Sequence, residues 1–150
     1  MTINERLQAE LESAMRSGDV LRRETVRMMR AALRNEEVAR RGVLDEQATM
    51  EVLQREVKKR QEALELYRKG GRQDLVAKAE GEISIISSYL PQQMSGEEIE
   101  RLVRETIQEL GANDVRQMGQ VMKVLMPRVK GRADGKLVSD TVRALLSKSG

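Results

Sequence analysis

Hydrophobic residues recur every three or four positions along most of the chain, which is the spacing of one face of an α-helix. The first such segment, 3–16, begins after a capping box formed by Thr2 and Glu5, and it stops at the sequence SGD. No segment keeps the strict alternation of polar and apolar residues that is typical of a half-buried strand. The pattern therefore predicts an all-α protein.

Three further helices are predicted to complete an N-terminal helical bundle over residues 1–92, and three shorter ones a C-terminal unit over 93–150. Each has a polar start signal and a glycine or proline near its end. The start and stop signals are, in chain order, Asp19 and Gly42, Asp45 and Gly70, Asp74 and Pro91, Ser95 and Gly111, and Asp114 and Pro127; Asp134 starts the last helix. The polar stretch PQQMSGEE marks the expected domain boundary.

The modest net charge of +3 is unevenly distributed along the chain. Residues 1–90 hold 17 Lys or Arg and 16 Asp or Glu, whereas residues 91–115 hold two and six. Residues 116–150 hold eight cations and two acids, a net charge of +6. The C-terminal unit is therefore predicted to carry a local basic patch, centred on the stretch MPRVKGRADGKLVSD.

The composition excludes several chemistries. The chain has no Cys, His, Trp or Phe, so disulfides, thiolate nucleophiles, Cys/His zinc sites and imidazole bases cannot form. Neighbouring acids such as Glu36 and Glu37 point about 100° apart on a helix and do not converge. We therefore expect no catalytic residues, no metal and no cofactor. The charged N-terminus and the lack of a long apolar run predict a cytoplasmic protein without a membrane partner.

The basic stretch has three interpretations, of which nucleotide binding is the weakest. The sequence GRADGKL has three residues between its glycines instead of four, Leu137 where a P-loop needs Ser or Thr, and no preceding strand. Asp134 is explained as the cap of the last helix, but this role does not explain the cations around it. Phosphate contact with nucleic acid and a simple solvated turn both remain open.

Gly119 is unusual because glycine inside a helix costs about 1 kcal/mol relative to alanine. Close packing of another helix explains such a residue best, and approach of a ligand is the second explanation. Lys123 lies in the same predicted helix, on the face opposite its apolar stripe.

Two stretches together resemble a known family. GRQDLVAKAEGEISIISSYLPQQMSGEEI at 71–99 and MGQVMKVLMPRVKGRADGKLVSDTVRALL at 118–146 are similar to the GatB/YqeY family, the stand-alone YqeY-like proteins whose helical domain resembles the C-terminal tail of the GatB component of glutamyl/aspartyl-tRNA amidotransferase. The resemblance covers essentially the whole chain. It implies an all-helical fold with a larger N-terminal and a smaller C-terminal unit.

The resemblance also implies a non-catalytic protein that binds tRNA or another folded RNA, because the amidotransferase tail engages tRNA while other domains carry the chemistry. With few aromatic rings, recognition would follow RNA shape and phosphates. By charge and placement, we assign this contact to Lys123, Arg128, Lys130, Arg132, Lys136 and Gly119. Two alternatives stay open. In the first, the chain is an accessory of glutamine-dependent tRNA amidation, its partner is an amidotransferase, and it shares the family label of a carbon–nitrogen ligase that uses glutamine as amide donor. In the second, it is a helical adaptor for another protein.

Overall fold

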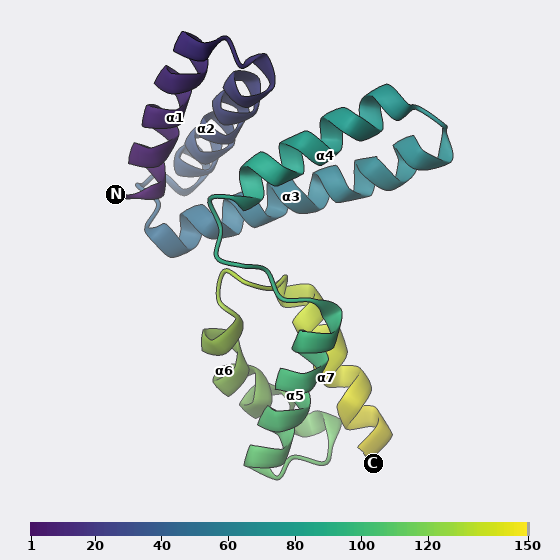
Figure 1. The fold of residues 1–150 in the computed structure, drawn as a ribbon. Coiled ribbons are helices and arrows are strands. Elements are labelled where there is room, and N and C mark those ends of the chain that lie inside the picture. Colours follow the sequence, from purple (N-terminus) through teal and green to yellow (C-terminus); the bar gives the residue numbers. More distant parts are fainter. Residues whose placement is uncertain (150) are drawn as a thin grey trace. The chain divides into compact units, whose positions relative to one another are not determined.

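In a computed structural model the chain folds into helices, and the structure describes residues 1–149. Seven α-helices and one short 3-10 helix make up the regular structure of that range, which contains no strand (Figure 1). The prediction of an all-α protein is confirmed. The chain divides into two compact units, one formed by Met1–Pro91 and the other beginning at Gln92.

The first unit consists of two helical hairpins. Its helices are α1 (Ile3–Ser17), α2 (Val20–Arg40), α3 (Glu46–Lys69) and α4 (Gln73–Ser87). Figure 1 shows α1 beside α2 and α3 beside α4, and α2 also packs against α3 and α4. The long helix α2 therefore joins the two hairpins into one core.

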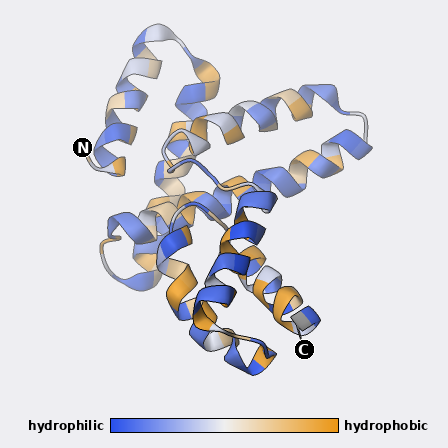
Figure 2. Cartoon of the chain, turned by 60° about the horizontal axis from the view of Figure 1, so that its bottom comes forward, coloured by the Kyte–Doolittle hydropathy of each residue, from blue (hydrophilic) through white to orange (hydrophobic). Residues whose placement is uncertain are grey.

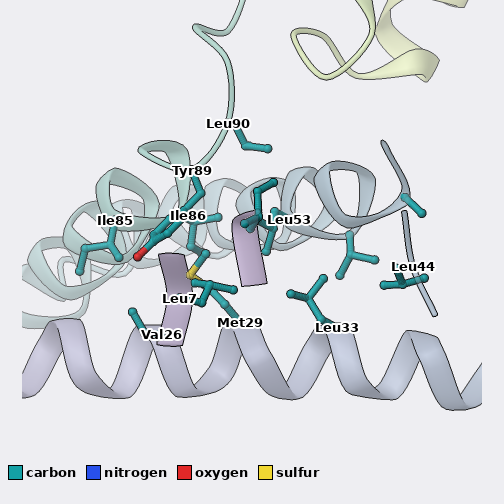
Figure 3. Packing of buried hydrophobic residues seen from close by; sticks show 13 residues of the cluster. Leu7, Val26, Met29, Leu33, Leu44, Leu53, Ile85, Ile86, Tyr89 and Leu90 are labelled. Atoms are coloured by element: carbon teal, nitrogen blue, oxygen red, sulfur yellow. The ribbon is translucent and has the colours of Figure 1, made fainter. Parts of the chain in front are cut away.

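That core is built from the apolar face of each helix. Figure 3 shows Met29 and Leu33 of α2 directed toward Leu53 and Ile86, and all four side chains are buried. Full burial of one such side chain stabilises the fold by about 1.5–3 kcal/mol. The helical spacing of these residues in the sequence is what places them on one side of their helices.

The predicted starts of the first three helices are confirmed by their caps. Thr2 and Glu5 form the capping box, the Asp19 carboxylate accepts from the backbone N–H of the third residue of α2 at 3.1 Å, and Asp45 does the same for α3 at 2.7 Å. The predicted stop at Gly42 is wrong by one residue. Arg41 takes the left-handed conformation, with φ of 56°, and ends α2.

Helix α4 begins within one residue of its predicted start but ends before Pro91, the predicted stop. It begins at Gln73, and Asp74 lies in its first turn. The helix stops at Ser87, and a tighter turn with i to i−3 hydrogen bonds carries the chain through Tyr89 and Leu90, both buried in the core of the first unit. Apolar spacing alone did not distinguish these turn residues from helical ones, because both point into the same core.

The second unit contains three helices and the 3-10 turn. These elements are α5 (Gly96–Leu110), η1 (Val115–Gln117), α6 (Met118–Val129) and α7 (Gly135–Ser149). Their shared core is apolar and includes Val103, Val121, Leu125 and Leu146, each of them fully buried. Figure 2 shows hydrophobic (orange) and hydrophilic (blue) residues mixed along each helix, as expected of helices with one buried face.

The predicted start and stop signals of α6, Asp114 and Pro127, do not act as the sequence predicted. Asp114 caps the 3-10 turn rather than α6 itself, and its hydrogen bond with the Arg116 side chain lowers the pKa of the Asp114 carboxyl. Pro127 was predicted to stop α6, but the helix continues to Val129. A proline lacks the N–H that would bond to Lys123 four residues earlier. Because only two residues follow, the last turn tolerates this loss.

Candidate nucleic-acid interface

The basic loop, residues Lys130–Asp134, joins α6 to α7 through a tight turn. Arg132 and Ala133 both donate their backbone N–H to the carbonyl of Val129, at 2.8 and 3.1 Å. Gly131, which precedes Arg132, is buried and has φ of 74°, in the left-handed region that favours glycine. The loop thus has a defined backbone conformation.

A second stretch of chain holds this loop in place. Gln93 Nε2 donates to the Gly131 carbonyl at 2.8 Å, Met94 N donates to the Arg132 carbonyl at 2.9 Å, and Arg132 Nε donates to the Gln92 carbonyl at 3.0 Å. The Met94 side chain packs on the core of the second unit. The segment 92–94, which includes the two glutamines of YLPQQ, therefore contacts KGRADGK, which lies far from it in the sequence.

Sequence reasoning did not identify this contact. The stretch PQQMSGEE was predicted only as a domain boundary, since nothing local distinguishes a glutamine at a boundary from one that bonds to a distant carbonyl. The only available signal was the resemblance, in which the two stretches stand out together. No single-residue pattern could have paired them.

Asp134 begins the last helix. Its Oδ1 accepts from the backbone N–H of Lys136 at 3.3 Å, which satisfies one of the free donors at the start of α7. A carboxylate in this position repels an approaching anion, so the backbone of α7 is not a free phosphate site. Any phosphate here has to be held by side chains.

Three of the predicted contact residues, with a glycine, share one surface. Gly119, Lys123 and Lys130 are exposed and follow one another at intervals of four and seven residues, so they lie on one side of α6 and at its end. A Cβ built on Gly135 would lie 3.8 Å from the Met126 methyl, which places the start of α7, and with it exposed Lys136, beside α6.

The ammonium groups of Lys123, Lys130 and Lys136 have no carboxylate within ion-pair distance among residues 1–149. They extend from α6, from the loop and from the start of α7. The arrangement thus presents three charges on one surface that no acid in the described chain neutralises. This surface is called the lysine face below.

The two predicted arginines have structural partners instead. Arg128 Nη2 pairs with Glu109 at 2.9 Å and its Nη1 donates to Thr106 at 3.1 Å, so it links α6 to α5. Arg132 uses its Nε to hold Gln92. The structure thus separates the predicted cations into three lysines that have no acidic partner and two arginines that also stabilise the unit.

Gly119 lies in open space. No atom of the described chain lies within 4 Å of a Cβ built at this position. Close packing of another helix, the explanation favoured from the sequence, is therefore wrong, and the glycine leaves its part of the surface unobstructed.

Neither a metal cluster nor a membrane-spanning helix is found in the described chain. No three acidic side chains in residues 1–149 are grouped so that they could hold an ion. None of the described helices combines the length and the apolar character needed to cross a bilayer.

The fold and this loop define a class, that of two-unit helical proteins whose C-terminal unit carries a braced basic turn. The chain belongs to the Yqey-like protein family, which it matches over residues 4–146. The resemblance noted from the two sequence stretches is thereby confirmed.

Curated relatives carry one common name. The chain is 30% identical to "Altered inheritance of mitochondria protein 41, mitochondrial" of Pyrenophora tritici-repentis, over 94% of this chain and 79% of that protein. Proteins of the same name match with 36% identity in Lachancea thermotolerans and 31% in Saccharomyces cerevisiae strain YJM789. Each of these two matches covers 57% of this chain and less than half of the relative.

These names overturn one expectation. A cytoplasmic protein was predicted from the charged N-terminus, whereas the curated relatives are named as mitochondrial proteins. The prediction relied on the chain's first residues and on its lack of a long apolar run, and neither feature distinguishes a cytoplasmic protein from a mitochondrial one.

Proposed function

We propose that the second unit binds folded RNA, with tRNA as the first candidate, through phosphate contacts on the lysine face. The observation that carries this proposal is the bracing of the basic loop by the segment 92–94. Two hydrogen bonds to loop carbonyls and a third from the Arg132 side chain hold the loop, so its backbone needs little ordering when Lys130 meets a phosphate track. Lys123 and Gly119 extend the same surface along α6.

Several properties favour RNA shape over base sequence as the recognised feature. The chain has two tyrosines and no other aromatic residue, so it offers almost no stacking platform for unpaired bases. Lysine ammonium groups contact phosphates as flexible point charges. Binding should therefore depend strongly on salt and weakly on sequence.

The two arginines contribute differently in this proposal. Arg132 keeps the loop attached to Gln92, and Arg128 is partly neutralised by Glu109. Both lie next to the lysine face in sequence, but their first role is to position it. Replacing them would alter the shape of the surface as well as its charge.

A salt titration of tRNA affinity tests the proposal. The loop variant combines Lys123→Gln, Lys130→Gln and Lys136→Gln. The control variant combines Arg16→Gln, Lys69→Gln and Lys78→Gln, which removes three exposed cations of the first unit. If each lysine neutralises one phosphate, the slope of log affinity against log salt becomes less steep by about 2 to 3 in the loop variant.

Circular dichroism establishes that both variants are folded. A loop variant that binds tRNA as tightly as the control variant, with the same salt dependence, would make the basic loop a solvated turn. A protein partner that persists in a ribonuclease-treated lysate, together with unchanged tRNA binding, would favour the adaptor alternative instead.

A further inference from the structure

A second row of cations lies on α2, in the unit whose net charge is close to zero. Arg23, Arg27, Arg30 and Arg34 follow one another at intervals of four, three and four residues. With 3.6 residues per turn these positions fall on one side of the helix, along about 16 Å of its axis at 1.5 Å per residue. These four residues are called the arginine stripe.

The stripe keeps most of its charge. Arg23 and Arg27 share a single acid, since both donate to Glu24 Oε1, at 3.0 and 3.3 Å. Arg30 and Arg34 have no acidic partner among the described residues. Four cations and one acid leave a surplus of three positive charges.

A neighbouring side of α2 is buried, and this fixes the direction of the stripe. Val26, Met29 and Leu33 belong to the core, so the helix cannot rotate the arginines inward. It also cannot lay an apolar face into a lipid interface, as a basic amphipathic membrane helix does, because that face is already occupied. The stripe is therefore a fixed surface for a partner in solution.

The stripe lacks the features of a protein interface core. Such cores depend on buried aromatic and aliphatic anchors with few charges. On α2 the exposed large hydrophobic residues are Val20 and Val38, at the two ends of the helix and outside the stripe. A row of one sign without apolar anchors fits a polyanion better than a folded protein surface.

We infer that the arginine stripe is a second phosphate-binding surface for the folded RNA that the proposed function already assigns to this chain. Guanidinium groups bind phosphate through two parallel N–H donors. Neighbouring arginines at intervals of three and four residues have Cβ atoms about 5–6 Å apart, so the row can contact successive phosphates of one strand. It would increase affinity without reading bases.

The test compares three variants of the full chain in tRNA affinity across a range of salt concentrations, with total tRNA as the probe. The stripe variant combines Arg27→Gln, Arg30→Gln and Arg34→Gln, and glutamine preserves helix propensity. The loop variant and the control variant are those defined above. All three remove three positive charges, so differences between them report position rather than net charge.

The stripe variant is expected to bind tRNA at least about tenfold more weakly than the control variant at about 0.1 M salt, with a slope less steep by about 2 to 3. Equal behaviour of the stripe and control variants overturns the inference. If the loop variant binds tRNA like the control variant and the stripe variant binds more weakly, the proposal for the lysine face is rejected and the inference about the arginine stripe is supported.

Two further outcomes would overturn the inference that the arginine stripe binds RNA. If the wild type binds no tRNA even at low salt, the proposed function and the stripe inference fail together. Poly-glutamate serves as an acidic polypeptide probe. If the stripe variant loses poly-glutamate binding and keeps its tRNA affinity, the stripe is a docking surface for acidic proteins and the RNA assignment is overturned.

Discussion

The guanidinium carbon of Arg6 lies 4.6 Å from the centroid of the Tyr89 ring, in a cation–π contact between α1 and the turn after α4. Arg6 Nη2 also donates to the carbonyl of Ser88 at 3.1 Å. The tyrosine is 4% exposed, and its hydroxyl has no hydrogen-bond partner in the described structure. Figure 3 shows the ring against Ile85 and Ile86.

Replacing Tyr89 by Phe keeps the ring and its contact with Arg6 and removes a buried hydroxyl without a partner. A buried polar group without a hydrogen bond destabilises the fold, so the free energy of unfolding should stay equal or rise by up to about 1 kcal/mol. Urea denaturation measures this change. Tyr89→Ala, which also removes the ring, should cost about 3–5 kcal/mol, and a loss of that size in Tyr89→Phe would show that the hydroxyl is bonded.

The same residue predicts a loss of stability at alkaline pH. Burial, with a smaller effect of the Glu10 charge, raises the pKa of Tyr89 to about 12, while the unfolded group titrates near 10. The hydroxyl keeps its proton in the folded state, so this stability is present below pH 10 and is lost as the pH rises from 10 toward 12.

Wild type should therefore lose stability more steeply than Tyr89→Phe across that range, and subtraction removes the contribution of lysines. Tyr67→Phe leaves Tyr89 as the sole tyrosine, so its absorbance on ionisation reports the pKa directly. A midpoint near 10 in the folded protein would contradict the prediction.

A partly buried ion network inside the first unit should be more sensitive to substitution than the ion pairs on its surface. Arg60 Nε contacts Glu82 at 3.0 Å, its Nη1 contacts Glu56 at 3.2 Å, and its Nη2 donates to the sulfur of Met28. Arg60→Met leaves the partly buried Glu82 carboxylate without this partner, while Glu56 keeps Lys59 at 3.2 Å, and it should destabilise the protein by about 1–3 kcal/mol.

Arg68→Met is the matched control for the Arg60 variant, because Arg68 pairs with Glu65 and Glu80 on the surface of the same hairpin. It should cost less than about 1 kcal/mol in thermal or urea unfolding. Equal losses in the two variants would mean that burial adds nothing to the Arg60 network.

Gly119 and Gly131 in the second unit should respond in opposite ways to replacement by alanine. Gly131→Ala places a Cβ on a residue with φ of 74° and should destabilise by about 1–2 kcal/mol. Gly119→Ala meets no atom within 4 Å and should stabilise by about 0.4–1 kcal/mol. If Gly119→Ala also weakens tRNA binding, the glycine serves the ligand. Calorimetry and tRNA titration together distinguish these roles.

Releasing Arg128 from its acidic partner should strengthen RNA binding if the proposed surface is right. Glu109→Gln removes the carboxylate that Arg128 contacts at 2.9 Å, and the salt slope should become steeper by about 0.8. The control is Glu100→Gln, since Glu100 pairs with Arg104 within α5. Identical slopes in the two variants would show that Arg128 does not reach a phosphate.

Local signals explain how much of the fold was predictable. Helix starts depend on a capping side chain and the next three residues, which is why Thr2, Asp19, Asp45 and Ser95 were placed correctly. The end of α6 was missed because burial of Val129 in the core outweighs the local effect of a proline.

The candidate site was less predictable, because its geometry is non-local. Charge identified the loop, but only the fold pairs Arg128 with Glu109, nineteen positions away, and the loop with the segment 92–94. Averaging charge over residues 1–90 concealed the arginine stripe. A net charge per segment cannot show that four cations share one helix face with a single acidic partner, Glu24.

The bonds from Gln92 and Gln93 to the basic loop join residues 40 and 38 positions apart. Closing so long a segment costs conformational entropy, which the packing of α5, α6 and α7 in the second unit helps to offset. We therefore expect the contact to form together with that core and not before it. During synthesis the lysine face does not exist until residue 136 has left the ribosome, so a chain truncated earlier cannot compete with the complete protein for its ligand.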